Sequence, residues 1–195
     1  MAIGRPRAFD IDKTLDLALQ VFWRHGYEGA SLPSLTKAMG INKPSLYATF
    51  GNKEALFRKV LDRYGEVQAA YIREALAAPT ARAVVERLLT GAVEVLGNPQ
   101  NPRGCLAVQG ALACGEGADC IRKELAARRR AREVALRQRL QRAKSEGDLA
   151  TDSDPADLAR FVMTVIQGMC VQAAGGTSRK ELQRVAQTAL RAWPK

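Results

Sequence analysis

The sequence predicts an all-α protein, and three observations support this fold class. Alanine and leucine, both strong helix formers, are frequent among the 195 residues. Runs of β-branched residues are short, and most apolar positions recur three or four residues apart, which is the helix period. Hydrophobic residues make up 47% of the chain and charged residues 26%, so one or two folded domains are expected. No run reaches the roughly 18 apolar residues of a membrane-spanning helix.

The first helix is expected from about Asp10 to His25. Asp10 or Asp12 suits the N-cap, and Gly26 suits the end of the helix, because glycine readily adopts the left-handed conformation. His25, the single histidine, would lie in the last turn, where the helix dipole favours a cation. The apolar stripe of this helix consists of Leu15, Ala18, Leu19 and Phe22.

Two short helices joined by a tight turn are expected over residues 31–50. Ser31 and Asn42 are residue types that favour the N-cap, and Gly40 suits the turn between the two helices. Pro44 falls in the first turn of the second helix, where its missing N–H costs nothing. This is the design of a helix-turn-helix, whose second helix enters the DNA major groove. An ordinary helical hairpin is the alternative.

Helices are also expected through the rest of the chain, with proline- and glycine-containing stretches between them. Their approximate ranges are 53–76, 80–97, 103–115, 119–146, 154–174 and 178–193.

The net charge of +10 favours polyanionic partners. Residues 1–53 carry seven basic and four acidic residues, whereas residues 122–144 carry ten basic and two acidic ones, so most of the excess lies outside the helix-turn-helix. Within the second segment, Arg132 falls on or beside the predicted core stripe of Ile121, Leu125, Leu136 and Leu140. It could pair with a carboxylate such as Glu116 or bind an acidic ligand. A rotated stripe that leaves Arg132 solvated is favoured.

The helix-turn-helix region resembles the TetR/AcrR family of bacterial transcriptional regulators. Over residues 10–61 the order of features is similar to the DNA-binding domain of that family, and the stretch GINKPSLYATFGNKEAL, residues 40–56, is its most specific part. The remaining two thirds is similar to the family only in length and in its helical layout. The resemblance therefore implies a DNA-binding domain over residues 1–52 and a ligand-binding and dimerisation domain over residues 53–195.

The resemblance also implies roles for residues in the DNA-binding part. Ser45 and Thr49 are expected near base edges, and Lys43 and Tyr47 on phosphate or in the groove. Lys53 is expected on phosphate, at the start of the helix over residues 53–76. Packing under Phe50 is the alternative for Tyr47. The family often has glycine at the position of Pro44 and a larger side chain at that of Ala48, so the base contacts here can differ. Arg5 and Arg7 form an arm that either lies in the minor groove or is a disordered terminus. The expected DNA-binding residues are Arg5, Arg7, Ser31, Lys43, Pro44, Ser45, Tyr47, Thr49 and Lys53.

For the second part, the resemblance implies a cavity for a small effector molecule and a pair of C-terminal helices that form a homodimer. Plain core packing is the alternative for each cavity residue, and the two glutamines are preferred because a polar group in an apolar stripe needs a partner. The expected ligand-binding residues are Tyr64, Tyr71, Val95, Cys105, Gln109, Leu112 and Gln167. The expected dimer interface contains Phe161, Val165, Gly168, Met169, Gln172, Leu182, Val185, Ala189 and Trp193.

Four cysteines, Cys105, Cys114, Cys120 and Cys170, lie in the second half without CxxC spacing. With a single histidine, this pattern favours neither a disulfide scaffold nor a metal site, and no cofactor is expected. Cys105 follows Arg103 and Gly104 at the expected start of a helix, which makes a redox- or electrophile-sensing thiol conceivable. A buried, inert thiol is the favoured alternative.

These observations predict a ligand-responsive transcriptional regulator, most simply a repressor that binds a palindromic double-stranded operator as a homodimer. The sequence contains no GxSxG, GxxxxGKS or HExxH motif, so an enzyme is not expected. The N-terminus lacks the apolar stretch of a secretory signal, which favours the cytoplasm. The alternatives are a regulator that senses oxidants or electrophiles through Cys105, and a basic protein that binds nucleic acid without sequence specificity.

Overall fold

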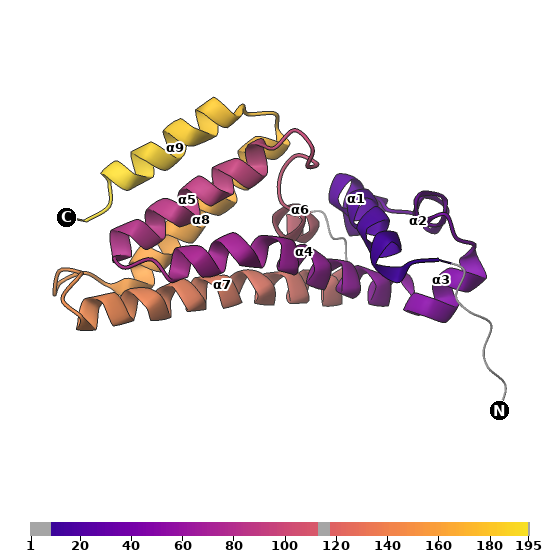
Figure 1. Ribbon diagram of the computed structural model, residues 1–195, viewed down its shortest axis with the longest axis horizontal. Coiled ribbons are helices and arrows are strands. Elements are labelled where there is room, and N and C mark those ends of the chain that lie inside the picture. The colour runs from indigo at the N-terminus through magenta and orange to yellow at the C-terminus, as the bar shows by residue number, and fades with distance from the viewer. Residues whose placement is uncertain (1–8, 113–117, 195) are drawn as a thin grey trace. The chain divides into compact units, whose positions relative to one another are not determined.

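The structure is a computed structural model that describes residues 9–112 and 118–194, without the side chains of residues 67–69 and 111–112. These residues form nine α-helices and no strand, as the helical periodicity predicts (Figure 1). The chain divides into two compact units, residues 1–67 and 68–195.

The first unit contains three complete helices and the beginning of a fourth. The helices are α1 (Ile11–Gly29), α2 (Leu32–Met39), α3 (Lys43–Phe50) and α4 (Lys53–Leu76), of which α4 continues into the second unit. Aromatic side chains fill the centre of this unit. The rings of Phe22 and Phe57 meet edge to face with centroids 4.9 Å apart, and the ring of Tyr27 lies 5.1 Å from that of Phe57.

Helix α1 differs from the expected helix at its C-terminal end. The carboxylate of Asp10 caps its start, as expected, by accepting from the N–H groups of Asp12 (2.9 Å) and Lys13 (3.2 Å). The break expected at Gly26 is present, because the backbone leaves the helical conformation at this residue, and a further short helical segment then runs to Gly29. Gly26 has a φ of 68° and kinks the helix. His25 is exposed in the last turn before this kink, as expected.

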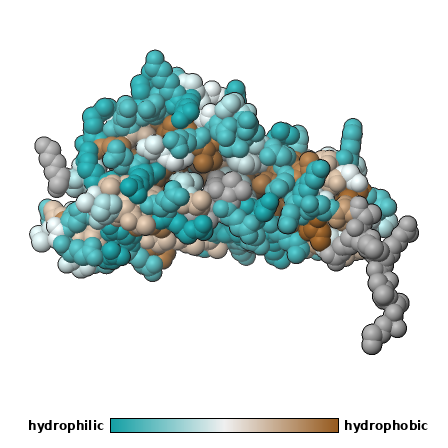
Figure 2. Space-filling view, in the orientation of Figure 1, coloured by the Kyte–Doolittle hydropathy of each residue, from teal (hydrophilic) through white to brown (hydrophobic). Residues whose placement is uncertain are grey.

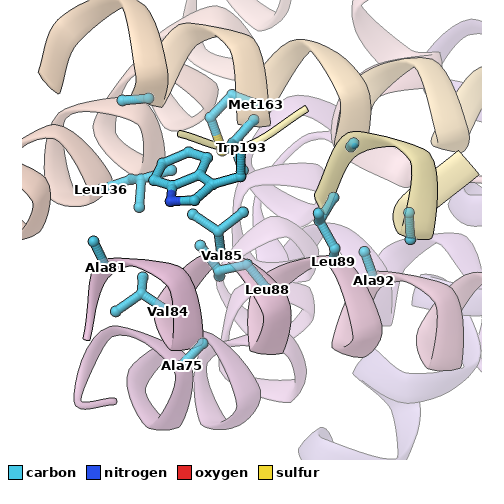
Figure 3. Packing of buried hydrophobic residues seen from close by; sticks show 14 of the residues in the cluster. Ala75, Ala81, Val84, Val85, Leu88, Leu89, Ala92, Leu136, Met163 and Trp193 are labelled. Carbon is cyan, nitrogen blue, oxygen red and sulfur yellow. The ribbon is translucent and has the colours of Figure 1, made fainter. Parts of the chain in front are cut away.

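The second unit is a bundle of the remaining helices with the end of α4. These are α5 (Ala81–Gly97), α6 (Leu106–Leu112), α7 (Asp119–Ser145), α8 (Pro155–Ala174) and α9 (Arg179–Arg191). Helix α5 packs against α8 and α9, and α7 packs against α6 and α8. The indole of Trp193, which is 4% exposed, lies in the core near Val85, Leu88 and Met163 (Figure 3).

The core stripe expected on α7 is confirmed, because Ile121, Leu125, Leu136 and Leu140 are all buried. Arg132 is half-buried, whereas Arg139 is the buried arginine of this helix, at 9% exposed. The guanidinium of Arg139 donates to the backbone carbonyls of Leu76 (3.1 Å), Ala78 (2.8 Å) and Pro79 (3.1 Å). It thereby binds α7 to the chain segment between α4 and α5.

Most of the face displayed in Figure 2 is hydrophilic, and hydrophobic residues reach the surface only in limited areas. Among the residues that the structure describes, no helix combines the length and the hydropathy that a membrane crossing requires.

Candidate DNA-binding and effector surfaces

Side-chain caps fix where α2 and α3 begin. The hydroxyl of Ser31 accepts from the N–H of Ser34 at 3.2 Å, and the side-chain oxygen of Asn42 accepts from the N–H of Ser45 at 2.8 Å. Between the two helices, Gly40 adopts the left-handed conformation, with φ 66° and ψ 26°. The predicted tight turn and both predicted N-caps are therefore present, and they set the direction in which α3 leaves the turn.

Helix α3 has a buried side and an exposed side. Leu46 and Phe50 are 0% and 3% exposed, so they anchor the helix in the first unit. Tyr47 is 43% exposed, so part of its side chain is open to a partner. Lys43, Pro44 and Ala48 are also exposed, and Ser45 and Thr49 are half-buried. The exposed side thus combines small polar groups, a phenol and an ammonium group, as a major-groove helix requires.

Two lysines contact aromatic rings near this surface. The ammonium group of Lys43 lies 5.8 Å from the centre of the Tyr47 ring. That of Lys53 lies 4.7 Å from the centre of the Tyr27 ring and donates to the backbone carbonyl of Glu28 at 3.4 Å. Partial burial lowers the pKa of Lys53, and the carboxylate of Glu28 opposes this effect. Lys53 therefore occupies a defined position at the start of α4.

Of the other expected DNA-binding residues, Ser31 is exposed at the start of α2. The expected arm, with Arg5 and Arg7, lies outside the described residues.

In the second unit, Tyr71 on α4 and Arg132 on α7 lie close to two cysteines. Burial raises the pKa of Tyr71 to about 12, and the positive charge of Arg132 opposes this shift. The thiols of Cys105 and Cys170 interact electrostatically with the same phenol. Gly91 on α5 leaves room for the Tyr71 ring, because a Cβ atom there would be 2.5 Å from Cδ2 of that ring.

Gln109 on α6 has a buried side-chain oxygen that accepts no hydrogen bond from the described residues. Its amide packs against Gly104, where an added Cβ atom would lie 2.8 Å from the amide carbon. Such an oxygen is costly to leave unpaired, so it is suited to a hydrogen-bond donor on a bound molecule. Cys105 immediately follows Gly104 and is 5% exposed.

The remaining expected ligand-binding residues are less clearly gathered. Gln167 on α8 and Val95 on α5 are half-buried. Tyr64 belongs to the first unit, where it is 2% exposed and its ring meets that of Trp23 at 4.7 Å. The side chain of Leu112 lies outside the described part of the structure.

Helices α8 and α9 share an exposed apolar groove of about 650 Å³. Phe161 and Val185, which are 40% and 43% exposed, line it from the two helices. Its other lining residues are Val165, Glu181, Arg184, Thr188, Ala189 and Ala192. Four residues expected at the dimer interface, Phe161, Val165, Val185 and Ala189, therefore line one surface. Gly168 and Gln172 are also exposed on α8.

Three residues expected at this interface lie in the core instead. Met169, Leu182 and Trp193 are 1%, 0% and 4% exposed, and all three belong to the core cluster of the second unit. The helical period does not distinguish a helix side that packs inward from one that meets a partner, because both are apolar.

Sequence reasoning missed two residues with defined partners. Cys170 was counted among the cysteines but was not connected with Cys105, because the two are far apart in the sequence. Arg139 was overlooked beside Arg132, although its position next to Leu140 and three residues after Leu136 indicates the buried side of a helix.

Comparisons with known proteins agree with this geometry. Residues 15–60 match a family model described as bacterial regulatory proteins of the tetR family, and residues 79–189 match one described as a tetracyclin repressor-like C-terminal domain. The chain is 37% identical to the transcriptional repressor ComR of Escherichia coli over 195 residues, which cover 98% of this chain and 92% of ComR. It is 30% identical to the repressor AcnR of Corynebacterium glutamicum, with 88% and 85% of the two chains covered.

A solved structure is similar over almost the whole chain. It contains a cysteine-substituted variant of the TetR family regulator CifR with 26-bp double-stranded operator DNA. The identity is 46% and the TM-score 0.94, and 97% of this chain and 100% of that chain are covered.

Proposed function

Because the chain belongs to the TetR family of bacterial transcriptional regulators, we propose that it represses transcription by binding a specific operator and that an effector molecule releases it. The exposed side of α3 is the single observation that carries the DNA-binding part of this proposal. Two buried anchors, Leu46 and Phe50, orient that side, and the caps at Ser31 and Asn42 fix the helix starts.

In the proposed complex, side chains on or near α3 divide into two groups. Ser45 and Thr49 read base edges, whereas Lys43, Tyr47 and Lys53 contact phosphates or the groove. Pro44 and Ser31 lie close to the DNA at the starts of their helices. The complex of CifR with operator DNA supports the binding of double-stranded DNA by this chain, since that protein is 46% identical to it.

The second part of the proposal is a homodimer formed through the exposed groove of α8 and α9. The burial of apolar side chains such as Phe161 and Val185 against a second copy removes them from water, which favours dimer formation. A two-fold dimer carries two copies of α3, which matches an operator with two inverted half-sites. We accordingly assign residues 1–52 to DNA binding and residues 53–195 to effector binding and dimerisation.

The third part concerns the effector, which we place beside Gln109, Tyr71 and Cys105. The unpaired oxygen of Gln109 suits an effector with an N–H or O–H donor. Gln167 is proposed as a second polar contact. No reaction is assigned to the chain, and its place of action is the cytoplasm, where bacterial DNA lies.

Selection of binding sites from a pool of random duplexes tests the DNA-binding proposal. A repressor should enrich one inverted repeat and bind it at least about 10³-fold more tightly than random DNA at the same salt concentration. A variant with Ser45 and Thr49 both replaced by alanine is the matched control and should not enrich that repeat. Equal affinity for all duplexes would instead support binding without sequence specificity through the basic residues of α7.

A further inference from the structure

Two cysteines from distant parts of the sequence meet in the second unit. Cys105 directly precedes α6, and Cys170 lies in the last part of α8. Each is 5% exposed, and their thiols are hydrogen-bonded to each other. Gly104 presses the same segment against α8, since a Cβ atom at Gly104 would lie 3.0 Å from the Cβ of Ala174. The two sulfur atoms are therefore neighbours in the folded chain.

The surroundings distinguish this pair from other cysteines. The hydrogen bond to Cys105 and, after it, burial raise the pKa of Cys170, while the charge of Arg132 opposes this rise. Cys120 is exposed at the start of α7, and its thiol forms no disulfide. It thus provides an internal comparison, because it is a free thiol in the same unit.

We propose that Cys105 and Cys170 form an intramolecular disulfide when the protein meets a hydroperoxide, and that this disulfide releases the operator. The inference rests on the proposed repressor function and adds a chemical input to it. It assigns the role of sensor to a pair of thiols, so Cys105 alone is insufficient.

The reaction takes place in two steps. The thiol of Cys105 gives up its proton as its sulfur attacks one oxygen of the hydroperoxide, and the O–O bond breaks. Cys105 becomes a sulfenic acid, and the leaving oxygen takes the proton and departs as alcohol or water. The sulfur of Cys170 then attacks the sulfur of the sulfenic acid, and the S–O bond breaks as the S–S bond forms. The thiol proton of Cys170 goes to the departing hydroxyl, which leaves as water. With hydrogen peroxide, two thiols and one peroxide give one disulfide and two waters.

The position of the pair indicates which part of the second unit oxidation would constrain. A disulfide brings the two sulfurs from hydrogen-bond contact to about 2.05 Å, which ties the segment before α6 to α8. Gln109, which we assign to the effector, lies one turn further along α6. Oxidation and effector binding would thus act on the same short helix.

The test treats purified reduced protein with hydrogen peroxide and follows two independent properties. Peptide mapping without reductant identifies the linked cysteines, and fluorescence anisotropy measures affinity for the operator selected from random duplexes. Wild type should gain a Cys105–Cys170 link and lose about tenfold or more in operator affinity, and dithiothreitol should restore both properties. Cys120→Ser is the matched control and should respond as wild type does.

Cys105→Ser and Cys170→Ser should each retain operator binding in peroxide, while their thermal unfolding and reduced affinity show that they are folded. Cys170→Ala provides a second substitution at the more constrained position. If Cys170→Ser releases DNA in peroxide as wild type does, the proposal of a cysteine pair is wrong and Cys105 acts alone.

A link that involves Cys114, or a Cys105–Cys170 link that leaves operator affinity unchanged, would also overturn the inference. Cys114→Ser distinguishes the first of these cases, because its response is then lost. If reduced wild type selects no operator, the proposed function fails. The mapping still shows separately whether the disulfide forms.

Discussion

At the scale of single residues, Tyr47 and Lys53 differ from Ser45 and Thr49 in what they can recognise. Phosphates are the same at every base pair, whereas base edges differ. We therefore expect Tyr47→Phe and Lys53→Ala to weaken operator and random DNA about equally. Lys53→Ala should also make the slope of log affinity against log salt concentration less steep by roughly one unit.

Substitutions of Ser45 or Thr49 should instead change which base is preferred within each half-site. Arg130→Ala, which removes a charge from the exposed surface of α7, is the control for a general loss of charge. If all four substitutions lower the affinity for every duplex to the same extent, the assignment of Ser45 and Thr49 to base edges is wrong.

Arg139 contributes to stability through the three carbonyls that it satisfies. Arg139→Leu leaves these acceptors without their charged donor, and we expect the free energy of unfolding to fall by about 1.5–3 kcal/mol. Arg139→Lys should recover only part of this loss, because an ammonium group lacks the planar fork of the guanidinium. Urea unfolding followed by circular dichroism measures both values.

Arg137→Ala, an exposed change on the same helix, should alter the unfolding free energy by less than about 0.5 kcal/mol. An equally small effect of Arg139→Leu would show that water replaces the lost donor.

Because of Tyr71, the free energy of unfolding should fall as the pH rises through the alkaline range. Its pKa of about 12 in the folded protein exceeds the unfolded value of about 10, so the folded state holds the phenolic proton more tightly. The resulting stability is fully present below pH 10 and is lost as the pH rises through 12. Between pH 10 and pH 12, the free energy of unfolding of wild type should fall by about 2–3 kcal/mol more than that of Tyr71→Phe, as measured by urea unfolding at each pH.

Tyr47→Phe removes an exposed phenol and should follow the wild-type curve. A Tyr71→Phe curve that also coincides with wild type would show that the phenol is solvated in the folded state.

At the scale of the elements, the residues that favour helix starts and turns were the most predictable. Ser31, Gly40 and Asn42 act through their own backbone neighbours, so local sequence suffices to place them. The break at Gly26 was predictable in the same way, whereas the short helical segment that continues to Gly29 was not. In that segment the ring of Tyr27 packs against that of Phe57, which is distant in the sequence.

The candidate sites also contain some features that local sequence predicts and others that depend on tertiary packing. The anchors of α3 follow from helical spacing, whereas the meeting of Cys105 with Cys170 depends on how α8 packs near α6. The core position of Trp193 likewise follows from tertiary packing at the end of α9.

A charged side chain in the groove of α8 and α9 should weaken the homodimer. Val185→Glu places a carboxylate in a surface that we propose to be buried in the dimer, and we expect the dimerisation free energy to weaken by about 2 kcal/mol or more. Analytical ultracentrifugation over a concentration series gives this value, and operator affinity should fall with it.

Gln183→Glu introduces the same charge on another side of α9 and should leave the dimer intact. Wild type that sediments as a monomer at micromolar concentration would contradict both the dimer and the palindromic operator.

At the scale of the whole molecule, effector binding must favour the conformation that has released DNA. An effector that binds both conformations equally shifts nothing, and a typical coupling is about 1–3 kcal/mol. Gln109→Leu and Gln167→Leu should therefore weaken induction and leave operator binding without effector unchanged. A reporter gene under the selected operator, exposed to a library of small molecules with N–H or O–H donors, measures induction.

Gln187→Leu, on the exposed surface of α9, is the control. If Gln109→Leu and Gln167→Leu both respond fully to an inducer of wild type, that inducer acts elsewhere.

The exposed groove of α8 and α9 also has a consequence for gene dosage. If only the paired form binds the operator, the concentration of active repressor varies with the square of the protomer concentration while most copies are single. Doubling the expression of this gene would then raise the active form about fourfold in that regime. The apolar area around Phe161 and Val185 would thus set the threshold abundance at which the target genes are silenced.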